Sequence, residues 1–383
     1  MKRYHENPIL VPDIQEEWES YATFNGSPIQ YKGKYYLFYR AISEEREQEG
    51  KRLRMSSIGV AQSEDGYKFS NRKEAIKPEM GYDRFGCEDP RATVFEDNIY
   101  VFYTGIGAYP FRADQIRVCL AYGDDPFNLK ERYLITPFNA KAMTLFPERI
   151  NGKITALITV NTDQPPSKIA LVQCDTLEEL FTKEFWDDWY CHLERHVLPI
   201  ARLSDDHVEV GTQVIKTRQG WLMIYAHIQH YKRSDKVFGF EAILLDEGNP
   251  RVIKARTWHP FMIPFEPYEL FGIVPNVIFP SGLTLKDNIL RLYYGAADTV
   301  VAIAEENIHD FLSRLDFVNP GITEIMRYRK NPVLTPRWDH EWEQINVYNP
   351  AAIDLDGRVH LLYRAQGKDG TSYIGYASSG NGY

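Results

Sequence analysis

Apolar residues along this chain gather in short runs, each preceded by a Gly or an Asp/Asn turn and rich in aromatic side chains. Such runs predict β-strands, because aromatic and β-branched residues suit a pleated, half-buried surface. The copies are "GKYYLFYRA" from Gly33, "DNIYVFYTG" from Asp97, "GKITALITV" from Gly152, "GWLMIYAH" from Gly220, "NILRLYYGA" from Asn288 and "GRVHLLYRA" from Gly357. They recur roughly every 55–70 residues, the size of one four-stranded propeller blade with its loops. The pattern therefore predicts an all-β propeller, whereas a plain β-sandwich would leave the regular repeat unexplained.

Helical periodicity is confined to two stretches. Residues 174–190, "CDTLEELFTKEFWDDWY", have an N-cap-like Asp175 followed by apolar residues at helical spacing. Residues 304–315, "AEENIHDFLSRL", have similar spacing. Both predict short helices that decorate a β scaffold.

The last part of the chain repeats its beginning. "KNPVLTP" matches "ENPILVP", "INVYNPAAIDLDGRVHLLYRA" matches "YATFNGSPIQYKGKYYLFYRA", and "SYIGYASSGNGY" matches "SSIGVAQSEDGY". We therefore expect residues 1–317 to form the propeller. Residues 328–383 are expected to form an extra, blade-like segment, either the start of a second copy or an accessory blade.

The composition and charge of the chain exclude some classes of binding partner. The 383 residues include 44% hydrophobic, 25% charged and 14% aromatic residues, and the net charge is −9 without a Lys/Arg-rich run. This balance argues against nucleic acid and anionic membranes as partners. The start, "MKRYHENPIL", lacks the apolar core of a signal peptide, and no apolar stretch is long enough to cross a membrane. We expect a cytoplasmic protein, with homo-oligomers left open.

The cysteines, Cys87, Cys119, Cys174 and Cys191, are widely spaced and form no CxxC pair. They indicate reduced thiols rather than a disulfide framework or a zinc site. The histidines show no metal-ligand spacing, and phosphate-binding glycine loops and serine-hydrolase elbows are missing. No metal and no cofactor are therefore expected.

An acidic pair stands out in "GCEDPRATVFEDNIYVFYTG", residues 86–105, where Glu88 and Asp89 precede a proline and Arg91. On its own this stretch is equally well explained by a solvated loop between two strands. Together with "LFPERINGK" at 145–153 and "GIVPNVIFPSG…LRLYYGAADTVVAIA" at 272–304, it resembles glycoside hydrolase family 130. That family contains β-mannoside phosphorylases and β-1,2-mannosidases. The resemblance covers about residues 6–305 and implies a five-bladed β-propeller with an axial active site.

The resemblance assigns Asp89 as the catalytic acid, acting through a sugar hydroxyl on the glycosidic oxygen. That oxygen must be protonated as the bond breaks. We expect the neighbouring carboxylate of Glu88 to help Asp89 keep its proton near neutral pH. Arg91 orients the loop or a substrate hydroxyl, or else forms a structural ion pair with Glu88 or Glu96.

Further sugar contacts carry over from the family one position at a time. Asn25 in "FNGSP" matches a sugar-binding asparagine, and Ser27 lies close to a small polar residue there. Arg40, which ends "LFYR", matches an arginine of the active-site ring. Asp298 in "GAADT" matches a carboxylate that holds mannose in the −1 subsite. Such polar groups distinguish one sugar epimer from another.

The chain departs from the family's phosphorylases at three phosphate-binding positions. Thr159, Glu209 and Ala226 stand where those enzymes have basic residues. Loss of all three removes the cations that a phosphate dianion requires. We therefore expect an inverting hydrolase that acts on β-linked mannosides, most simply a β-1,2-mannosidase.

An inverting hydrolase needs a general base opposite the acid. Glu209 is our first choice, and Glu241 in "GFEAILLD" is the second choice or a partner that holds the same water. The alternative is a β-mannoside phosphorylase, in which His227 or Lys216 rebuilds part of a phosphate site. A mannosyltransferase and a non-catalytic mannan-binding propeller also stay open. The expected partner is a β-mannoside oligosaccharide.

Overall fold

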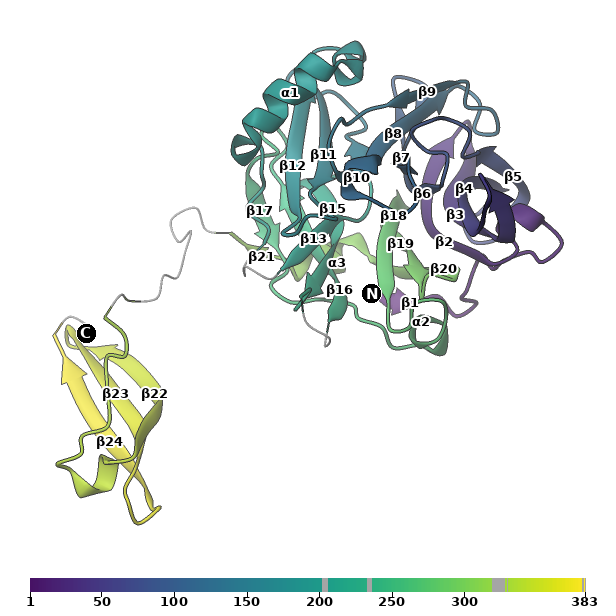
Figure 1. Ribbon diagram of the computed structural model, residues 1–383. Coiled ribbons are helices and arrows are strands. Elements are labelled where there is room, and N and C mark those ends of the chain that lie inside the picture. The colour runs from purple at the N-terminus through teal and green to yellow at the C-terminus, as the bar shows by residue number, and fades with distance from the viewer. Residues whose placement is uncertain (202–205, 233–235, 319–327, 329, 381, 383) are drawn as a thin grey trace. The chain divides into compact units, whose positions relative to one another are not determined.

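The computed structural model describes residues 1–201, 206–232, 236–318, 328, 330–380 and 382. It divides the chain into two compact units, Met1–Asn319 and Pro320–Tyr383 (Figure 1). None of the described helices is long and apolar enough to cross a membrane.

Unit 1 is built from five antiparallel sheets among the residues that the structure describes. The first contains β2 (Ala22–Tyr31), β3 (Lys34–Gln48), β4 (Lys51–Ser63) and β5 (Ser70–Ile76), and the second β6 (Cys87–Phe95), β7 (Asn98–Ile106), β8 (Ile116–Gly123) and β9 (Glu131–Leu134). The third contains β10 (Ala140–Leu145), β11 (Ile154–Val160) and β12 (Lys168–Cys174). The fourth contains β13 (His207–Val210), β14 (Ile215–Thr217), β15 (Gly220–Gln229), β16 (Val237–Leu245), β17 (Ile253–Arg256) and β21 (Asp316–Phe317). The fifth contains β18 (Ile278–Lys286), β19 (Ile289–Ala296), β20 (Val300–Asn307) and β1 (Lys2–Arg3).

The aromatic repeats of the sequence lie at equivalent places in these sheets. They form β3, β7, β11, β15 and β19, each of which pairs with the first strand of its own sheet. The prediction of a mostly β fold with one repeat per sheet is confirmed. Turn residues ahead of each repeat end one strand and start the next, which is why the sequence marks them so clearly.

The first strands of the sheets pack against one another. Strand β2 contacts β6 and β18, β6 contacts β10, and β10 contacts β13. The Ser27 hydroxyl accepts a hydrogen bond from the Ala92 backbone N at 2.9 Å, which joins β2 to β6. The Gln213 side-chain amide donates to the carbonyl oxygens of Pro28 and Leu283, both at 2.8 Å, and so links three sheets. Neighbouring sheets therefore satisfy the hydrogen-bonding groups of these buried side chains.

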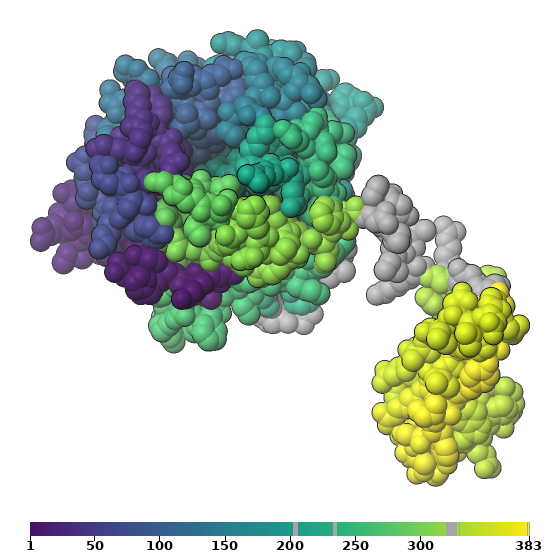
Figure 2. Space-filling view, turned by 180° about the vertical axis from the view of Figure 1, so that it is seen from behind, coloured from purple at the N-terminus to yellow at the C-terminus, as the bar shows by residue number. Residues whose placement is uncertain are grey.

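The N-terminus completes the fifth sheet. Lys2 pairs with Glu305 and Arg3 with Ala304, so β1 adds to the edge of β20 (Figures 1 and 2). Arg3 also forms an ion pair with buried Glu269, with Nε to Oε1 at 2.7 Å. The sheet is therefore assembled from both ends of unit 1.

Short helices lie outside the sheets. They are α1 (Lys183–Cys191), α2 (Pro267–Leu270) and α3 (Ile308–Ser313), with 3-10 turns η1 (Glu17–Glu19), η2 (Ala113–Gln115), η3 (Leu177–Phe181), η4 (Leu193–Arg195) and, in unit 2, η5 (Glu341–Glu343). Both predicted helices exist, but with different starts. Helix α1 is capped by the Thr182 hydroxyl, which accepts from Phe185 N, and not by Asp175. The residues before Ile308 belong to β20 (Val300–Asn307), because they continue its pairing with β19, from Ala304 with Leu292 to Asn307 with Ile289.

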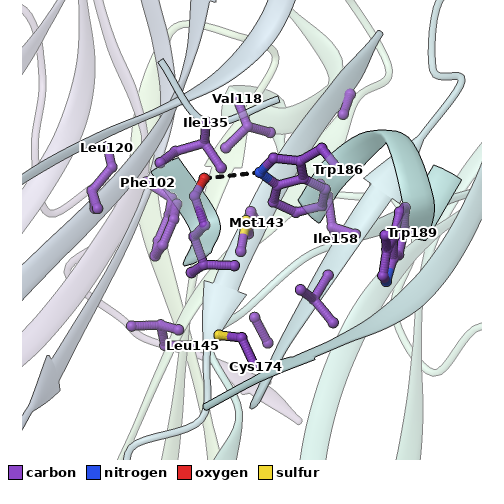
Figure 3. Close-up of a cluster of buried hydrophobic side chains, with 14 of the residues drawn as sticks. Phe102, Val118, Leu120, Ile135, Met143, Leu145, Ile158, Cys174, Trp186 and Trp189 are labelled. Carbon is purple, nitrogen blue, oxygen red and sulfur yellow. Dashed lines mark hydrogen bonds between the residues drawn. The ribbon is translucent and has the colours of Figure 1, made fainter. Parts of the chain in front are cut away.

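Helix α1 covers the interface between the second and third sheets. Trp186 is fully buried there among side chains such as Phe102, Val118 and Ile158 (Figure 3). Its indole N–H donates to the Leu180 carbonyl at 2.8 Å, so the polar edge of the ring is satisfied. Burying an indole of this size stabilises the fold by about 2–3 kcal/mol.

Unit 2 contains one antiparallel sheet in the order β22–β23–β24. Its strands are β22 (Asn346–Leu355), β23 (Arg358–Gln366) and β24 (Ser372–Ser379). Strand β23 is the last of the aromatic repeats. Whether this unit begins a second propeller or serves as an accessory blade stays a prediction.

We expect a chain that ends after residue 317 to unfold cooperatively, with a melting temperature within about 2 °C of the full chain's main transition. The five sheets of unit 1 are each completed by strands from residues 1–317. As a control, deletion of residues 1–3 removes β1 and should lower that temperature. Differential scanning calorimetry checks both, and an aggregated or non-cooperative truncated chain would show that the tail is an integral part of the fold.

Candidate active site

Two predicted site residues occupy equivalent irregularities in neighbouring sheets. Pairing of β2 with β3 shifts register between Phe24 and Ser27, and pairing of β6 with β7 shifts between Glu88 and Arg91. Asn25 and Asp89 lie in these bulges with φ of 52° and 51°. Asn and Asp tolerate this left-handed conformation better than most residues, and a bulge redirects the side chain. The Asn25 amide consequently donates to Asp89 Oδ1 at 2.7 Å.

Arg40 ties this pair to Glu88. Its guanidinium lies 2.6 Å from Glu88 Oε1 and 3.5 Å from Asp89 Oδ1, and its Nε donates to the Ser56 hydroxyl at 3.1 Å. Asn25 Oδ1 is buried with no hydrogen-bond partner among the described residues. That acceptor can therefore receive a hydroxyl hydrogen from a ligand. The structure brings Asn25, Arg40, Glu88 and Asp89 together as the sequence predicts.

The proton of the acidic pair is not where we expected it. Burial favours the neutral acid, yet the charge of Arg40 and the Asn25 hydrogen bond outweigh it and hold the pKa of Asp89 below its ordinary value. Burial raises the pKa of Glu88, and the Arg40 charge does not fully offset it. Contrary to our expectation, the carboxyl group whose pKa is raised is therefore that of Glu88 and not that of Asp89. Two carboxyl groups that share one cation favour protonation of the partner with fewer hydrogen bonds.

Asp298 lies in the same electrostatic environment. It follows β19 in a left-handed conformation, with φ of 49°. Burial raises its pKa to about 6, because the charges of Asp89 and Glu88 reinforce the desolvation and Arg40 only partly opposes it. Asp298 therefore changes charge within the physiological range and, when ionised, presents a strong hydrogen-bond acceptor to a sugar hydroxyl.

We expect Asp298→Asn to raise the melting temperature at pH 7 by several degrees while impairing catalysis. A carboxyl whose pKa is raised on folding stabilises the fold below about pH 4 and loses that contribution as the pH rises through about 6. Asparagine mimics the neutral form, so the difference from the unmodified chain should widen between pH 4 and pH 7. Asp287→Asn, at an exposed turn aspartate with φ of 51°, is the matched control. Equal pH dependence for Asp298→Asn and the unmodified chain would contradict the assignment.

Arg91 bonds to backbone carbonyls next to the acidic pair, and its Nε is buried without a hydrogen-bond partner among the described residues. Its side chain is fully buried, and its guanidinium donates to the Pro90 carbonyl at 2.9 Å and to Val210 O at 3.4 Å. Burial lowers its pKa to about 10, so it stays charged at neutral pH. The predicted ion pairs are not formed among the described residues, where Glu88 pairs with Arg40 and Glu96 with Arg149. Arg91 instead holds the Asp89 bulge against β13.

Glu209 is a second carboxylate whose charge acts on Arg91. It projects from β13, its side chain is 16% exposed, and its Oε1 lies 2.8 Å from His207 Nε2. Its charge and that of Asp89 both act on Arg91, so both carboxyl groups lie in the electrostatic environment of this guanidinium. The placement of Glu209 across the site from Asp89 stays a prediction.

The sequence did not point to Lys141, which the structure adds to the site. It lies on β10 just before Ala142, whose φ of 46° marks the bulge equivalent to that of Asp89. Its ammonium is 3.4 Å from Asp163 Oδ1. Burial would lower its pKa, but the charges of Asp163, Glu209 and the acidic pair outweigh it and raise the pKa. Lys141 therefore supplies a charged amine in the field of Asp89 and Glu209. Equivalence to Glu88 in the next sheet is the sequence signal that could have identified it.

His207 and Tyr231 are two further missed neighbours of this part of the site. Their rings stack at 3.9 Å between centroids, with an interplanar angle of 13°. The charge of Glu209 helps burial to raise the pKa of Tyr231, which places the phenol in the same field. Neither residue stands in a recognisable motif, so the sequence alone did not reveal them.

Three other predicted residues have structural roles. Glu241 is fully buried, and its two oxygens lie 2.7 Å from Tyr225 OH and His227 Nδ1. His227 also lies 3.1 Å from Asp206 Oδ1, so this histidine is held between two carboxylates. We therefore correct both assignments: Glu241 is not placed to act as a base, and His227 is not placed to bind phosphate or sugar. Ser27 is likewise fully buried and joins β2 to β6.

Of the phosphate-binding positions that the sequence indicated, Thr159 and Ala226 are buried inside their sheets. The Thr159 hydroxyl accepts from Val210 N at 2.8 Å. Lys216 is paired with Glu148 and Glu247. Within the described ranges, no cluster of His, Cys, Asp and Glu has the arrangement of a metal site.

Comparison with known proteins agrees with this arrangement. The model of glycoside hydrolase family 130 that is described as beta-1,4-mannooligosaccharide phosphorylase matches residues 2–317. The 1,2-beta-oligomannan phosphorylase of Thermoanaerobacter sp. (strain X514) is 33% identical over 307 residues, which cover 79% of this chain and 96% of the relative.

Two solved structures share the fold. The beta-1,2-mannobiose phosphorylase of Listeria innocua, solved with beta-1,2-mannobiose, superposes with a TM-score of 0.64 at 24% identity and covers 82% of this chain and 98% of its own. A structure described with glycoside hydrolases that target beta-1,2 mannosidic linkages in Candida mannan superposes with a TM-score of 0.63 at 21% identity and covers 80% and 93%. The family match over most of unit 1, together with the acidic pair and Arg40 at the strand bulges, leads to one conclusion. This chain belongs to glycoside hydrolase family 130.

Proposed function

We propose that the five sheets of unit 1 are the blades of a five-bladed propeller and that the site at their first strands cleaves β-1,2-linked mannosides by phosphorolysis. The products are then mannose 1-phosphate and a shortened mannoside. Two relatives that are 33% and 31% identical to this chain are named phosphorylases. Their names support phosphate rather than water as the acceptor. The expected hydrolase becomes the second candidate.

The observation that carries the proposal is the charged amine of Lys141. It lies in the field of Glu88, Asp89 and Glu209, and its ammonium is 3.4 Å from Asp163 Oδ1, whereas Arg40 is paired with Glu88. An anionic acceptor needs a cation where it attacks, and burial strengthens such an interaction. Lys141 thus compensates in part for the basic residues missing at Thr159, Glu209 and Ala226.

In this mechanism the mannosyl unit binds with its hydroxyls on Asn25, Arg40 and Asp298. The sugar excludes water from Asp89, and that desolvation shifts the carboxyl toward its acid form. Asp89 gives its proton, through a sugar hydroxyl, to the glycosidic oxygen as the bond to C1 breaks. Phosphate held by Lys141 forms the new bond to C1 from the opposite face, which inverts the anomeric centre.

Glu209 favours the second candidate, inverting hydrolysis. Its charge acts on Arg91 together with that of Asp89, and it would repel a phosphate dianion. Its contact with His207 Nε2 would let it take a proton from an attacking water, with His207 stabilising the carboxylate. In that reaction the products are free mannose and the shortened mannoside.

Product analysis with a short β-1,2-mannoside, with and without inorganic phosphate, tests the proposal. We expect a phosphate-dependent rate and mannose 1-phosphate as the product, followed by anion-exchange chromatography. Free mannose at a rate that phosphate does not change would overturn phosphorolysis and establish the hydrolase.

A further inference from the structure

Unit 2 copies the first sheet of unit 1 in conformation as well as in sequence. Strand β22 pairs with β23 with a register shift between Tyr348 and Ala351, the position equivalent to the bulge in β2. Asn349 lies in this bulge with φ of 52°, the value found for Asn25. The copy therefore presents an asparagine in the same backbone conformation as the sugar-facing one.

The arginine next to this asparagine is held in the same way in both sheets. Arg364 Nε donates to the Ser372 hydroxyl at 3.0 Å, as Arg40 does to Ser56 at 3.1 Å. The Arg364 guanidinium lies 4.8 Å from the centre of the Tyr348 ring, as Arg40 lies 5.0 Å from Phe24. These contacts lie within unit 2, so the arginine is oriented without help from a second sheet.

The copy differs where the first sheet joins its neighbour. Ser27, which bonds to Ala92 of the second sheet, is replaced by Ala351. Tyr31, whose hydroxyl donates to two carbonyls of the second sheet, is replaced by Leu355. Unit 2 thus keeps the groups that orient Asn349 and Arg364 and has lost the polar groups that attach a second sheet.

The face that carries Arg364 is open. Leu362, Ile374 and Tyr376 are 54%, 74% and 59% exposed, whereas the equivalent Phe38, Ile58 and Val60 are fully buried. Arg364 pairs directly with Ile374, and Leu362 with Tyr376, so these side chains share one face of the sheet. An apolar surface with an exposed tyrosine suits the C–H face of a pyranose, and an adjacent arginine and amide suit its hydroxyls.

We propose that unit 2 is a non-catalytic binding site for mannosyl units of a β-mannan chain, formed by Asn349, Arg364 and the open face beside them. This inference rests on the sugar-binding role proposed for Asn25 and Arg40. The site is non-catalytic because the copy has no counterpart of the acidic pair, which belongs to the second sheet of unit 1. Its ligand is the same class of sugar that unit 1 cleaves, and its effect is to hold long substrates on the enzyme.

Calorimetric titration of the full chain with a long β-1,2-oligomannoside tests this site, with Asp89→Asn in place to stop turnover. We expect two classes of binding site. Adding Asn349→Gly and Arg364→Lys should weaken the second class about tenfold, the loss of one or two hydrogen bonds to a sugar. Glycine keeps the left-handed backbone and lysine keeps the charge, so the sheet should stay folded, which circular dichroism checks. Arg358→Lys, the same change on the same strand, is the matched control and should leave both classes intact.

Three results would overturn the site. One is a single class of binding site in the Asp89→Asn chain, and another is equal affinity in the Asn349→Gly/Arg364→Lys and Arg358→Lys chains. The third is a dimer in sedimentation that Ile374→Lys dissociates without changing mannoside binding, which would make the open face a protein interface. Cleavage of a disaccharide by chains with Asp89 intact reports unit 1 separately. Failure to cleave the disaccharide would contradict the proposed function. The difference in oligomannoside affinity between the Asn349→Gly/Arg364→Lys and Arg358→Lys chains reports unit 2 alone.

Discussion

Asp89→Asn is expected to slow cleavage of a short β-1,2-mannoside by about 10² to 10⁴, the usual contribution of a positioned general acid. Asparagine has the shape of aspartate and accepts the left-handed conformation of this bulge, so the binding of mannoside should be largely retained. The loss should therefore fall on kcat rather than on KM. Initial rates over a range of substrate concentrations separate the two parameters.

Asp97→Asn is the matched control, because Asp97 is an exposed aspartate with φ of 62° in the turn that follows β6. It should cleave at the rate of the unmodified chain. A substrate whose leaving group needs no proton should recover much of the rate in Asp89→Asn. Normal turnover by Asp89→Asn on an ordinary mannoside would remove Asp89 from the chemistry under either acceptor.

If phosphate is the acceptor, Lys141→Met and Glu209→Gln should change KM for phosphate in opposite directions. Loss of the ammonium should raise KM for phosphate by about 10- to 100-fold, the effect of removing one charged hydrogen bond in a buried site. Glu209→Gln removes a like charge next to the phosphate and should lower that KM. Initial rates at varied phosphate concentration measure both effects.

Hydrolysis predicts a different outcome for the same two variants. Glu209→Gln should then lower the rate of hydrolysis by about 10²- to 10⁴-fold, because no base activates the water. Azide should restore part of that rate. Lys183→Met, at an exposed lysine of α1, is the control for the loss of a lysine and should match the unmodified chain. If neither Lys141 nor Glu209 affects the rate, both proposed acceptor sites are wrong.

The predictable part of this fold was local. Gly and Asp/Asn turns ahead of aromatic runs identified the second strand of each sheet, since turn chemistry and side-chain alternation are both encoded within about ten residues. The strand β1 was not predicted, because two residues carry no pattern of their own and pair only with β20. Asp175 was mistaken for a helix cap because Thr182 competes for the same role a few residues later.

The candidate site also has a part that local motifs predict and a part that depends on the folded structure. Asn25, Arg40, Glu88 and Asp89 come together because they are carried by motifs that the family resemblance identifies. Burial could not be seen in advance, so Glu241 and His227 were assigned to the site although they bond to each other inside a sheet. The protonation of the acidic pair depends on the position of Arg40 relative to Glu88 and Asp89, which a sequence does not give.

The pairing of β1 with β20 has a consequence for how the protein is made. Residues 2 and 305 become neighbours in one sheet, so β1 finds its partner only when about three hundred more residues have emerged from the ribosome. At about 5–20 residues per second that interval is roughly 15–60 s. Until then β1 has no partner strand and the fifth sheet lacks its β20 edge, and contacts so distant along the chain form slowly. Nascent chains that stop short of residue 307 should therefore depend on chaperones, whereas longer ones can close unit 1 by themselves.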